Sequence, residues 1–258
     1  MELIKKAVKV GNSAGVLLPK RWLNTRVKVI LEPENVGLEI LEILAEHNLL
    51  KKVVGVYLIG SYARNEQTID SDVDVLAITS GGGGKVLKGR YEVLCVSKEE
   101  AKKQLDQNAL PLLAMLKEAK PIINEELLKE LSAPLTLRNL RWHIETTRSA
   151  MNVVEEYIKM ADECGEDVAD AAAYSLILRL RTLYIIDCLR KNRLWNTPGL
   201  LRLVEKISGS TTAYERYLQV KRRDAMGYKL KKEEAEKIRR YIIAEVDRTE
   251  KWLKEKKD

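Results

Sequence analysis

The chain of 258 residues is 45% apolar and carries a net charge of +7, so it is long enough for one large or two moderate cores. No stretch reaches the roughly 20 uncharged apolar residues of a membrane helix, and the N-terminus lacks the apolar core of a signal peptide, so we expect a soluble, cytoplasmic protein. Cys95, Cys164 and Cys188 lie far apart and accompany only two histidines, which argues against a disulfide framework or a zinc site and leaves buried apolar filling as their expected role.

The first 32 residues form a basic segment that predicts short strands. They hold seven Lys and Arg against two Glu. Alternation of Val and Lys around residues 8–10 and 27–29 indicates half-buried strands, with a turn at 11–15 and another strand at 16–22. About 30 residues of this kind cannot bury a core alone. A second copy would supply the missing surface, so we expect a homodimer.

This segment resembles the swapped-hairpin DNA-binding fold of the AbrB type, because V-G-N-S and L-P-K occur in the same order. The resemblance implies strands interleaved between two chains and basic side chains on DNA phosphates, which position a protein without reading sequence. The alternative is a dimerisation arm whose lysines only protect strand edges. The candidate DNA-contacting residues are Lys5, Lys6, Lys9, Lys20, Arg21, Arg26 and Lys28.

Residues 33–135 carry a net charge of −4 and alternate between helix and strand patterns. Four consecutive glycines, Gly81 to Gly84, predict a flexible loop between strands and not a phosphate loop, because no G-K-[ST] follows them. The predicted elements are a helix at 36–52, strands at 53–60, 71–79 and 89–97, and a helix at 98–120 that is kinked or broken near Pro111.

The strongest chemical signal lies between residues 60 and 76. Gly60 and Ser61 stand where a strand turns into a helix, so exposed N–H groups and the serine hydroxyl favour a phosphate there. Asp72 and Asp74 are two apart on a predicted strand, which points both carboxylates to one face. Such a pair suits Mg²⁺, which takes one or two carboxylates together with water and phosphate oxygens. One ion would orient a triphosphate, and a second would activate an attacking hydroxyl.

Glu92 is the candidate third metal ligand, since a neighbouring strand would bring it beside Asp72 and Asp74. The alternative for Glu92 is an exposed strand glutamate. For the two aspartates the alternative is a solvated or capping pair at the start of a strand.

The order G-S-x-A-R, a gap, then S-D-x-D resembles the minimal nucleotidyltransferases of prokaryotes in the DNA polymerase beta superfamily. The resemblance covers roughly residues 36–131 and implies a mixed sheet with flanking helices, Mg²⁺ at the carboxylates, and transfer of a nucleoside monophosphate to a hydroxyl. It also implies nucleotide contacts from Gly60, Ser61, Arg64 and Ser71. Asn65 stands where that family often has glycine. The matching residues are Gly60, Ser61, Ala63, Arg64, Ser71, Asp72 and Asp74.

Residues 136–258 carry a net charge of +6 and predict helices throughout. Steps of three and four from Leu137 to Ala161 draw one apolar stripe along a long helix. Further helices are predicted at about 169–190, after Pro198, at 214–226, and on a last segment with Ile238, Ile242, Val246, Thr249 and Leu253 on one face.

This helical part resembles the HEPN bundles that often accompany minimal nucleotidyltransferases. Those bundles can be ribonucleases when they carry, late in the bundle, an Arg, four to six further residues and then a His. The corresponding place here reads Arg223 to Gly227 without histidine, so RNA cleavage is not expected there. Arg138, Asn139 and His143 form R-N-x-x-x-H on the first helix, where we expect an exposed polar face. The expected role of the bundle is to wall the nucleotide cleft and to mediate dimer contacts.

These patterns predict an α+β protein: an N-terminal β-hairpin module at 1–34, a small mixed-sheet nucleotidyltransferase domain at 35–132 and an antiparallel helical bundle at 133–258. The expected activity is Mg²⁺-dependent transfer of a nucleoside monophosphate from a nucleoside triphosphate, ATP in the first place, to a hydroxyl, with release of pyrophosphate. The acceptor, a protein tyrosine, an RNA end or a small antibiotic, is not defined by these residues. The alternative function is a DNA-binding regulator or antitoxin-like protein whose nucleotidyltransferase fold is a nucleotide-sensing scaffold.

Overall fold

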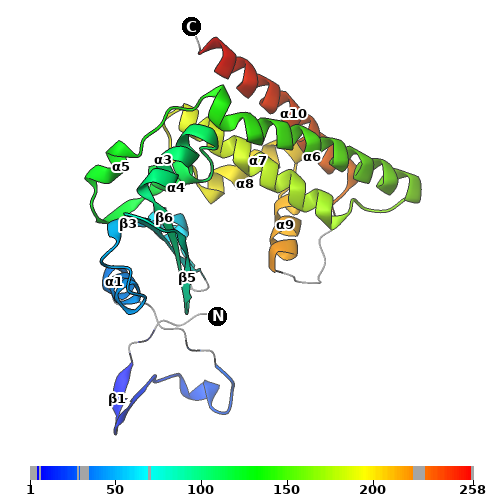
Figure 1. Cartoon of the computed structure of the whole chain (residues 1–258). Coiled ribbons are helices and arrows are strands. Elements are labelled where there is room, and N and C mark those ends of the chain that lie inside the picture. The colour runs from blue at the N-terminus through cyan, green and yellow to red at the C-terminus, as the bar shows by residue number, and fades with distance from the viewer. Residues whose placement is uncertain are drawn as a thin grey trace. The chain divides into compact units, whose positions relative to one another are not determined.

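The chain divides into two compact units, Met1–Glu34 and Asn35–Asp258. Figure 1 shows the computed structural model. The structure describes residues 5, 7–27, 29, 35–68, 71–222 and 230–256. The predicted DNA-contacting Lys6 and Lys28 and the segment Arg223 to Gly227 lie outside the described residues.

The N-terminal unit contains a β-hairpin, as predicted, but its second strand is displaced. Strands β1 (Val8–Val10) and β2 (Ser13–Gly15) pair antiparallel, with Val8 opposite Gly15. The second strand therefore uses residues that the sequence assigns to a turn. Residues 16–19 form no strand, and Lys20–Trp22 form the 3₁₀-helix η1. The tight turn is made possible by Gly11, whose φ of +59° a glycine adopts without strain.

The second unit is built on a five-stranded mixed sheet with strand order β5-β6-β4-β3-β7. Only β4 and β6 run parallel, and the other neighbours are antiparallel, so the predicted mixed sheet is confirmed. The edge strands β5 and β7 were not predicted, because β5 is largely exposed and β7 has only four residues, one of them a proline. The strands are β3 (Val53–Leu58), β4 (Val73–Thr79), β5 (Gly84–Lys88), β6 (Tyr91–Ser97) and β7 (Lys120–Ile123).

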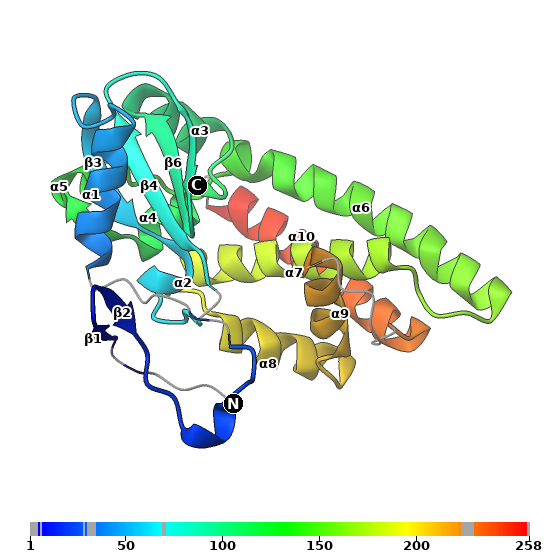
Figure 2. The same cartoon turned by 90° about the horizontal axis from the view of Figure 1, so that it is seen from below.

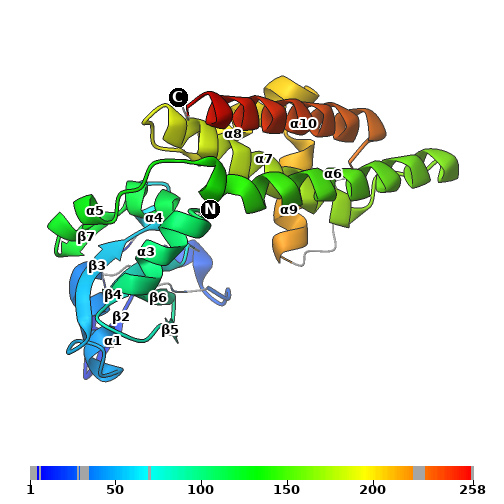
Figure 3. The same ribbon diagram turned by 45° about the horizontal axis from the view of Figure 1, so that its top comes forward.

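Helices cover both faces of this sheet (Figure 3). Alternating residues of β4 serve the two faces: Val75 packs with the core residues of α1 (Val36–Glu46), whereas Leu76 packs with those of α3 (Lys98–Gln107) and α4 (Leu112–Glu118). The segment between α3 and α4 contains Pro111, which confirms the predicted break in the helix. A short helix, α5 (Glu126–Glu130), follows β7.

The C-terminal helices share a core with the α3–α4 face of the sheet. The capping box of Thr136 and Asn139 fixes the start of the long first helix, and Gly165 ends it in the left-handed conformation. These helices agree with the predicted helical region. They are α6 (Leu137–Cys164), α7 (Asp170–Arg190), α8 (Thr197–Ser208), α9 (Thr212–Arg222) and α10 (Lys232–Glu255).

Helix α6 overturns two expectations. Asn139 and His143 do not lie on an exposed polar face: they are 3% and 8% exposed, and the Asn139 side chain donates to the backbone oxygens of Leu105 and Pro134. Packing of α3 beside the apolar stripe widens the buried face of α6 to include them. Cys164, expected to be buried, is exposed at the end of α6. None of the helices in the described part of the chain is long and apolar enough to cross a membrane.

Candidate functional site

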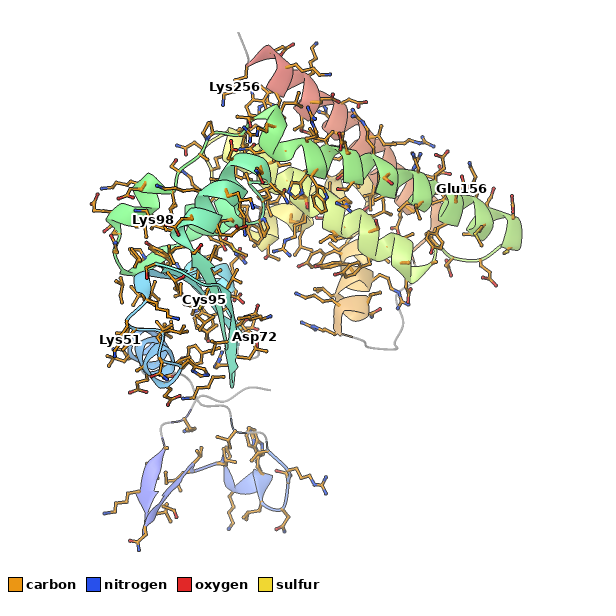
Figure 4. All side chains as sticks on the ribbon, viewed as in Figure 1. Lys51, Asp72, Cys95, Lys98, Glu156 and Lys256 are labelled. Atoms are coloured by element: carbon orange, nitrogen blue, oxygen red, sulfur yellow. The ribbon has the colours of Figure 1, made fainter. Side chains whose placement is uncertain are left out.

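The predicted site residues gather at one end of the sheet, where β3 ends and β4 and β6 begin. Asp72 directly precedes β4, and Figure 4 marks it at the end of the sheet opposite Lys98. Because β4 and β6 are parallel and β3 is antiparallel to β4, the turn that leaves β3 at Gly60 meets the first residues of the other two strands.

Strand register places Asp74 and Glu92 on the same face. They are direct partners in the parallel ladder, and their neighbours Val73, Val75 and Tyr91 turn to the opposite, α1-covered face. Asp72 lies one residue before the strand and is exposed. Within the described part of the chain, the carboxylates of Asp72 and Asp74 have no hydrogen-bond or ion-pair partner. The oxygens of both carboxylates are therefore available to a cation.

Glu92, in contrast to Asp72 and Asp74, already has an ion-pair partner. Its Oε1 lies 2.7 Å from Lys85 Nζ on the edge strand β5, and its side chain is 41% exposed. The register brings Glu92 beside Asp74 as predicted, but a metal ion would have to compete with Lys85 for it. Among the described residues, no three His, Cys, Asp or Glu side chains are already arranged as a metal site.

The local electrostatics favour a cation at Asp74. Burial raises the pKa of Asp74, and the charges of Glu92, Asp72 and Glu118 raise it further, while Arg64 lowers it. A carboxylate held among three others is stabilised by a bound cation, and hard oxygen donors are the ligands that Mg²⁺ prefers. Asp72 and Asp74, completed by water or phosphate oxygens, are therefore a donor pair that fits Mg²⁺.

The Asp74 side chain leaves no room for a side chain at position 60. Its φ is +70°, and a Cβ atom at this position would lie 2.3 Å from Asp74 Oδ2. The Ile59 N–H donates to the Asp74 carbonyl oxygen at 2.9 Å, so the turn and the strand are tied together. Glycine is needed here both for its conformation and for the space that Asp74 occupies.

At the Gly60–Ser61 turn, one of the two groups expected to bind phosphate is already occupied. The Gly60 N–H, expected to face a phosphate, donates to Glu118 Oε1 at 2.8 Å. The Ser61 hydroxyl has no hydrogen-bond partner in the part of unit 2 that the structure describes, so it is available to a ligand. The Ser71 hydroxyl accepts from the Thr68 N–H at 2.8 Å, so it already has a protein partner.

Arg64 is the predicted nucleotide contact whose surroundings differ most from the expectation. Its Nη1 donates to Glu118 Oε2 at 2.7 Å and its Nε to Glu66 Oε2 at 2.9 Å. The guanidinium carbon lies 3.8 Å from the centroid of the Trp195 ring. Only 10% of the Arg64 side chain is exposed, so the structure joins it to protein groups.

The backbone conformation of Asn65 explains why asparagine can replace the glycine that minimal nucleotidyltransferases often have at this position. Its φ is +56°, in the left-handed region that Asn tolerates best after glycine. Its Oδ1 accepts from Lys120 Nζ at 2.6 Å, and the same ammonium donates to the Tyr62 carbonyl oxygen at 3.3 Å. Lys120 on β7 thus stabilises the end of the short helix α2 (Gly60–Ala63).

Two further residues that shape the site were not predicted. Arg90 Nη2 donates to the Ser71 carbonyl oxygen at 2.8 Å and to the Tyr62 hydroxyl, so it holds the segment that leads into Asp72. Glu118 ends α4 and is 8% exposed. Glu118 follows Lys117 at the end of an apolar run, so its sequence surroundings gave no clear signal for a buried, paired carboxylate.

Residues 38–144 match the family model described as nucleotidyltransferase domain, which supports the predicted superfamily for the segment containing Gly60 and Asp74. No curated protein matches the chain. A solved nucleotidyltransferase-like protein from Exiguobacterium sibiricum is 13% identical, with a TM-score of 0.38 over 83% of this chain and 75% of its own. A spectinomycin adenyltransferase from Enterococcus faecialis, solved with ATP and spectinomycin, is 15% identical, with a TM-score of 0.43 over 82% and 98%. No comparison tests the AbrB-like or HEPN-like resemblance, so both stay predictions.

Proposed function

We propose that this chain transfers a nucleoside monophosphate from a nucleoside triphosphate, ATP in the first place, to a hydroxyl group. The observation that carries this proposal is the pair Asp72 and Asp74, whose carboxylates have no hydrogen-bond or ion-pair partner among the described residues. At the same end of the sheet, the Ser61 hydroxyl has no hydrogen-bond partner among the described residues either. The family match over residues 38–144 supports it. In the reaction the acceptor oxygen bonds to the α-phosphorus, the bond from the α-phosphorus to the bridging oxygen breaks so that pyrophosphate leaves, and the proton of the acceptor hydroxyl passes to solvent.

Each group has a role that follows from its chemistry. Asp72 and Asp74 would hold Mg²⁺, with Glu92 as a third ligand once it leaves Lys85. Bound Mg²⁺ supplies charge neutralisation of the triphosphate and lowers the pKa of the attacking hydroxyl. Ser61 would donate a hydrogen bond to a phosphate oxygen. Arg64 and Ser71 would serve this site by holding its protein groups, as their described contacts favour.

Substitution of Asp74 tests this function. Isothermal titration of ATP with Mg²⁺, and release of pyrophosphate in the presence of cell extract, are compared between wild type, Asp74→Asn and Asp72→Asn. We expect both variants to lose at least 10²-fold in turnover, because the charge that binds the cation is removed. Asp106→Asn, on an exposed aspartate paired with Arg138, is the matched control. Equal ATP affinity and turnover in Asp74→Asn and wild type would refute the metal assignment.

The acceptor is found by labelling. Incubation of the protein with labelled triphosphates and cell extract, followed by identification of the labelled molecule, distinguishes a protein side chain, an RNA end and a small hydroxyl compound. The Asp74→Asn variant is the background control in each case.

A second candidate function, DNA binding, is favoured by the composition of the N-terminal unit. None of its described residues is buried, and Lys5, Lys9, Lys20 and Arg21 are all exposed. A polyanion would meet these charges. The triple variant Lys9→Glu, Lys20→Glu, Arg21→Glu should lose DNA retardation while its nucleotide binding is unchanged. Retardation equal to that of wild type would refute DNA binding by this unit.

A further inference from the structure

A buried ion-pair network links the Gly60 turn to the helical region. Glu118 uses one carboxylate oxygen for the Gly60 N–H and the other for Arg64, at 2.8 and 2.7 Å. Only 5% of the Glu118 side chain and 10% of the Arg64 side chain are exposed. Charge-assisted hydrogen bonds in such surroundings are short and directional, so the position of Gly60 is fixed by Glu118 as well as by its own strand.

The network continues into the bundle through Glu66. Its Oε2 accepts from Arg64 Nε at 2.9 Å, and its Oε1 accepts from the N–H of Thr197, the first residue of α8, at 2.9 Å. The Thr197 hydroxyl also donates to Glu66, at 3.1 Å. Figure 2 shows α2 beside the start of α8. Glu66 therefore caps a helix of the bundle while it holds Arg64.

Trp195, which lies between α7 and α8, contacts Arg64 from the side of the helical region. Its indole is 7% exposed, and the guanidinium carbons of Arg64 and Arg181 lie 3.8 and 4.8 Å from the ring centroid. Cation–π contacts of this kind restrict a guanidinium to one plane. Arg64 is thus held on three sides, by Glu118, Glu66 and Trp195, and is oriented toward Glu118.

We infer that Glu118 and Arg64 are positioning residues that hold the Gly60–Ser61 turn against Asp74, and that the bundle sets this geometry through Glu66 and Trp195. This inference rests on the proposed function. It assigns to Arg64 a role other than the direct nucleotide contact that the sequence motif suggests. Gly60 is the contact point, because its N–H binds Glu118 while its Cα faces the Asp74 carboxylate.

The first measurement follows the Gly60 amide and does not depend on turnover. In Glu118→Ala the Gly60 N–H loses its acceptor, so its hydrogen exchange, measured by NMR on ¹⁵N-labelled full-length protein, should become at least tenfold faster. Glu118→Gln keeps an oxygen at this place and should exchange more slowly than Glu118→Ala. Glu126→Ala, on an exposed glutamate paired with Lys129, is the control and should leave Gly60 unchanged. Equal Gly60 exchange in wild type and Glu118→Ala would overturn the inference.

The second measurement is a kinetic double-mutant cycle of Arg64→Met and Glu118→Gln. Since Arg64 acts through Glu118, each single variant should lower kcat at least tenfold with little change in KM for the triphosphate, and the double variant should lose little more than either single one. Losses that multiply, with a KM raised by Arg64→Met alone, would mean direct contact with the nucleotide and would overturn the role of Arg64.

The two proposals fail in different ways. A wild-type protein that neither binds nor turns over the triphosphate overturns the proposed function and the positioning role with it. An active wild type whose Glu118→Ala variant turns over normally, with Gly60 exchange accelerated, overturns the positioning role alone.

Discussion

Gly60, two residues after the end of β3, lies directly against the Asp74 side chain of β4. A Cβ atom on residue 60 would lie 2.3 Å from Asp74 Oδ2 and 3.1 Å from Asp74 Cβ and Cγ. The contact ties a backbone position at φ +70° to a carboxylate at the start of β4. A side chain at residue 60 would therefore displace the proposed metal ligand Asp74.

The first prediction concerns Gly60→Ala. The left-handed conformation costs a non-glycine residue about 1–2 kcal/mol, and the added methyl group must displace the Asp74 carboxylate. We expect a lower free energy of unfolding in urea and a loss of at least tenfold in turnover. Gly81→Ala is the control, because no atom lies within 4 Å of its Cβ position and its φ is not positive. Unchanged turnover in Gly60→Ala would contradict this account of the site.

The second prediction separates the two interpretations of Glu92. As a metal ligand, Glu92 should bind the cation more readily once Lys85 is removed, so Lys85→Met should lower the apparent Kd for Mg²⁺, whereas Glu92→Gln should raise it about tenfold or more. The measurement is the Mg²⁺ dependence of turnover. If Glu92 is only the partner of Lys85, both substitutions should have the same small effect, as expected for an exposed ion pair of less than about 1 kcal/mol.

The third prediction concerns metal addition and removal. A ligand that binds only the folded state adds RT ln(1 + [L]/Kd) to stability, about 1.4 kcal/mol at tenfold excess over Kd. We expect Mg²⁺ to raise the Tm of wild type and EDTA to reverse the effect. In Asp74→Asn the Tm without metal should equal or exceed that of wild type, because one of several adjacent carboxylates is neutralised, and Mg²⁺ should no longer raise it. A Tm of wild type that does not respond to Mg²⁺ would argue against the site.

The central elements of the sheet and the site could be predicted from sequence because their signals are local. Asp72 and Asp74 precede and enter a run of apolar residues, and Gly60 follows another, so strand, turn and carboxylates were evident from spacing alone. The edge strand β5 lacked such a signal, since its residues Gly84–Lys88 are mostly exposed and follow a run of glycines.

The long-range contacts could not be predicted. Glu118 lies 54 residues from Arg64, and Thr197 lies 131 residues from Glu66. Nothing in the local pattern of either segment specifies its partner. The burial of His143 was missed for a related reason. It lies beside the apolar stripe of α6, and it is interior because segments distant in sequence, among them Leu110 after α3 and Arg179 of α7, lie around it.

The fourth prediction concerns association through the N-terminal unit. Leu17 and Leu23 are 69% and 67% exposed, in a unit of which no described residue is buried. A second copy that covers them would supply the apolar burial that this unit lacks by itself. We expect the full-length protein to sediment as a dimer and the double variant Leu17→Ser, Leu23→Ser to sediment as a monomer. Leu87→Ser, on a leucine of β5 that is 68% exposed, should leave the dimer intact. A wild-type monomer at micromolar concentration would contradict the predicted homodimer.

The last prediction is a loss of stability at mildly acid pH that originates at His143. Burial lowers the pKa of His143, with Arg179 acting in the same direction and a hydrogen bond to the Leu110 backbone opposing them. As the pH falls, the histidine of the unfolded chain, with an ordinary pKa of about 6.5, therefore takes up a proton at a higher pH than His143 of the folded chain does.

Stability from this group is fully present above pH of about 6.5 and is lost as the pH falls toward the folded pKa, by at most about 1.4 kcal/mol per pH unit. Urea unfolding at pH 7.5 and pH 5.5 should show this loss in wild type and a smaller one in His143→Gln. His47→Gln, which replaces the exposed second histidine, should behave as wild type. An equal loss in His143→Gln and wild type would place the acid sensitivity elsewhere in the molecule.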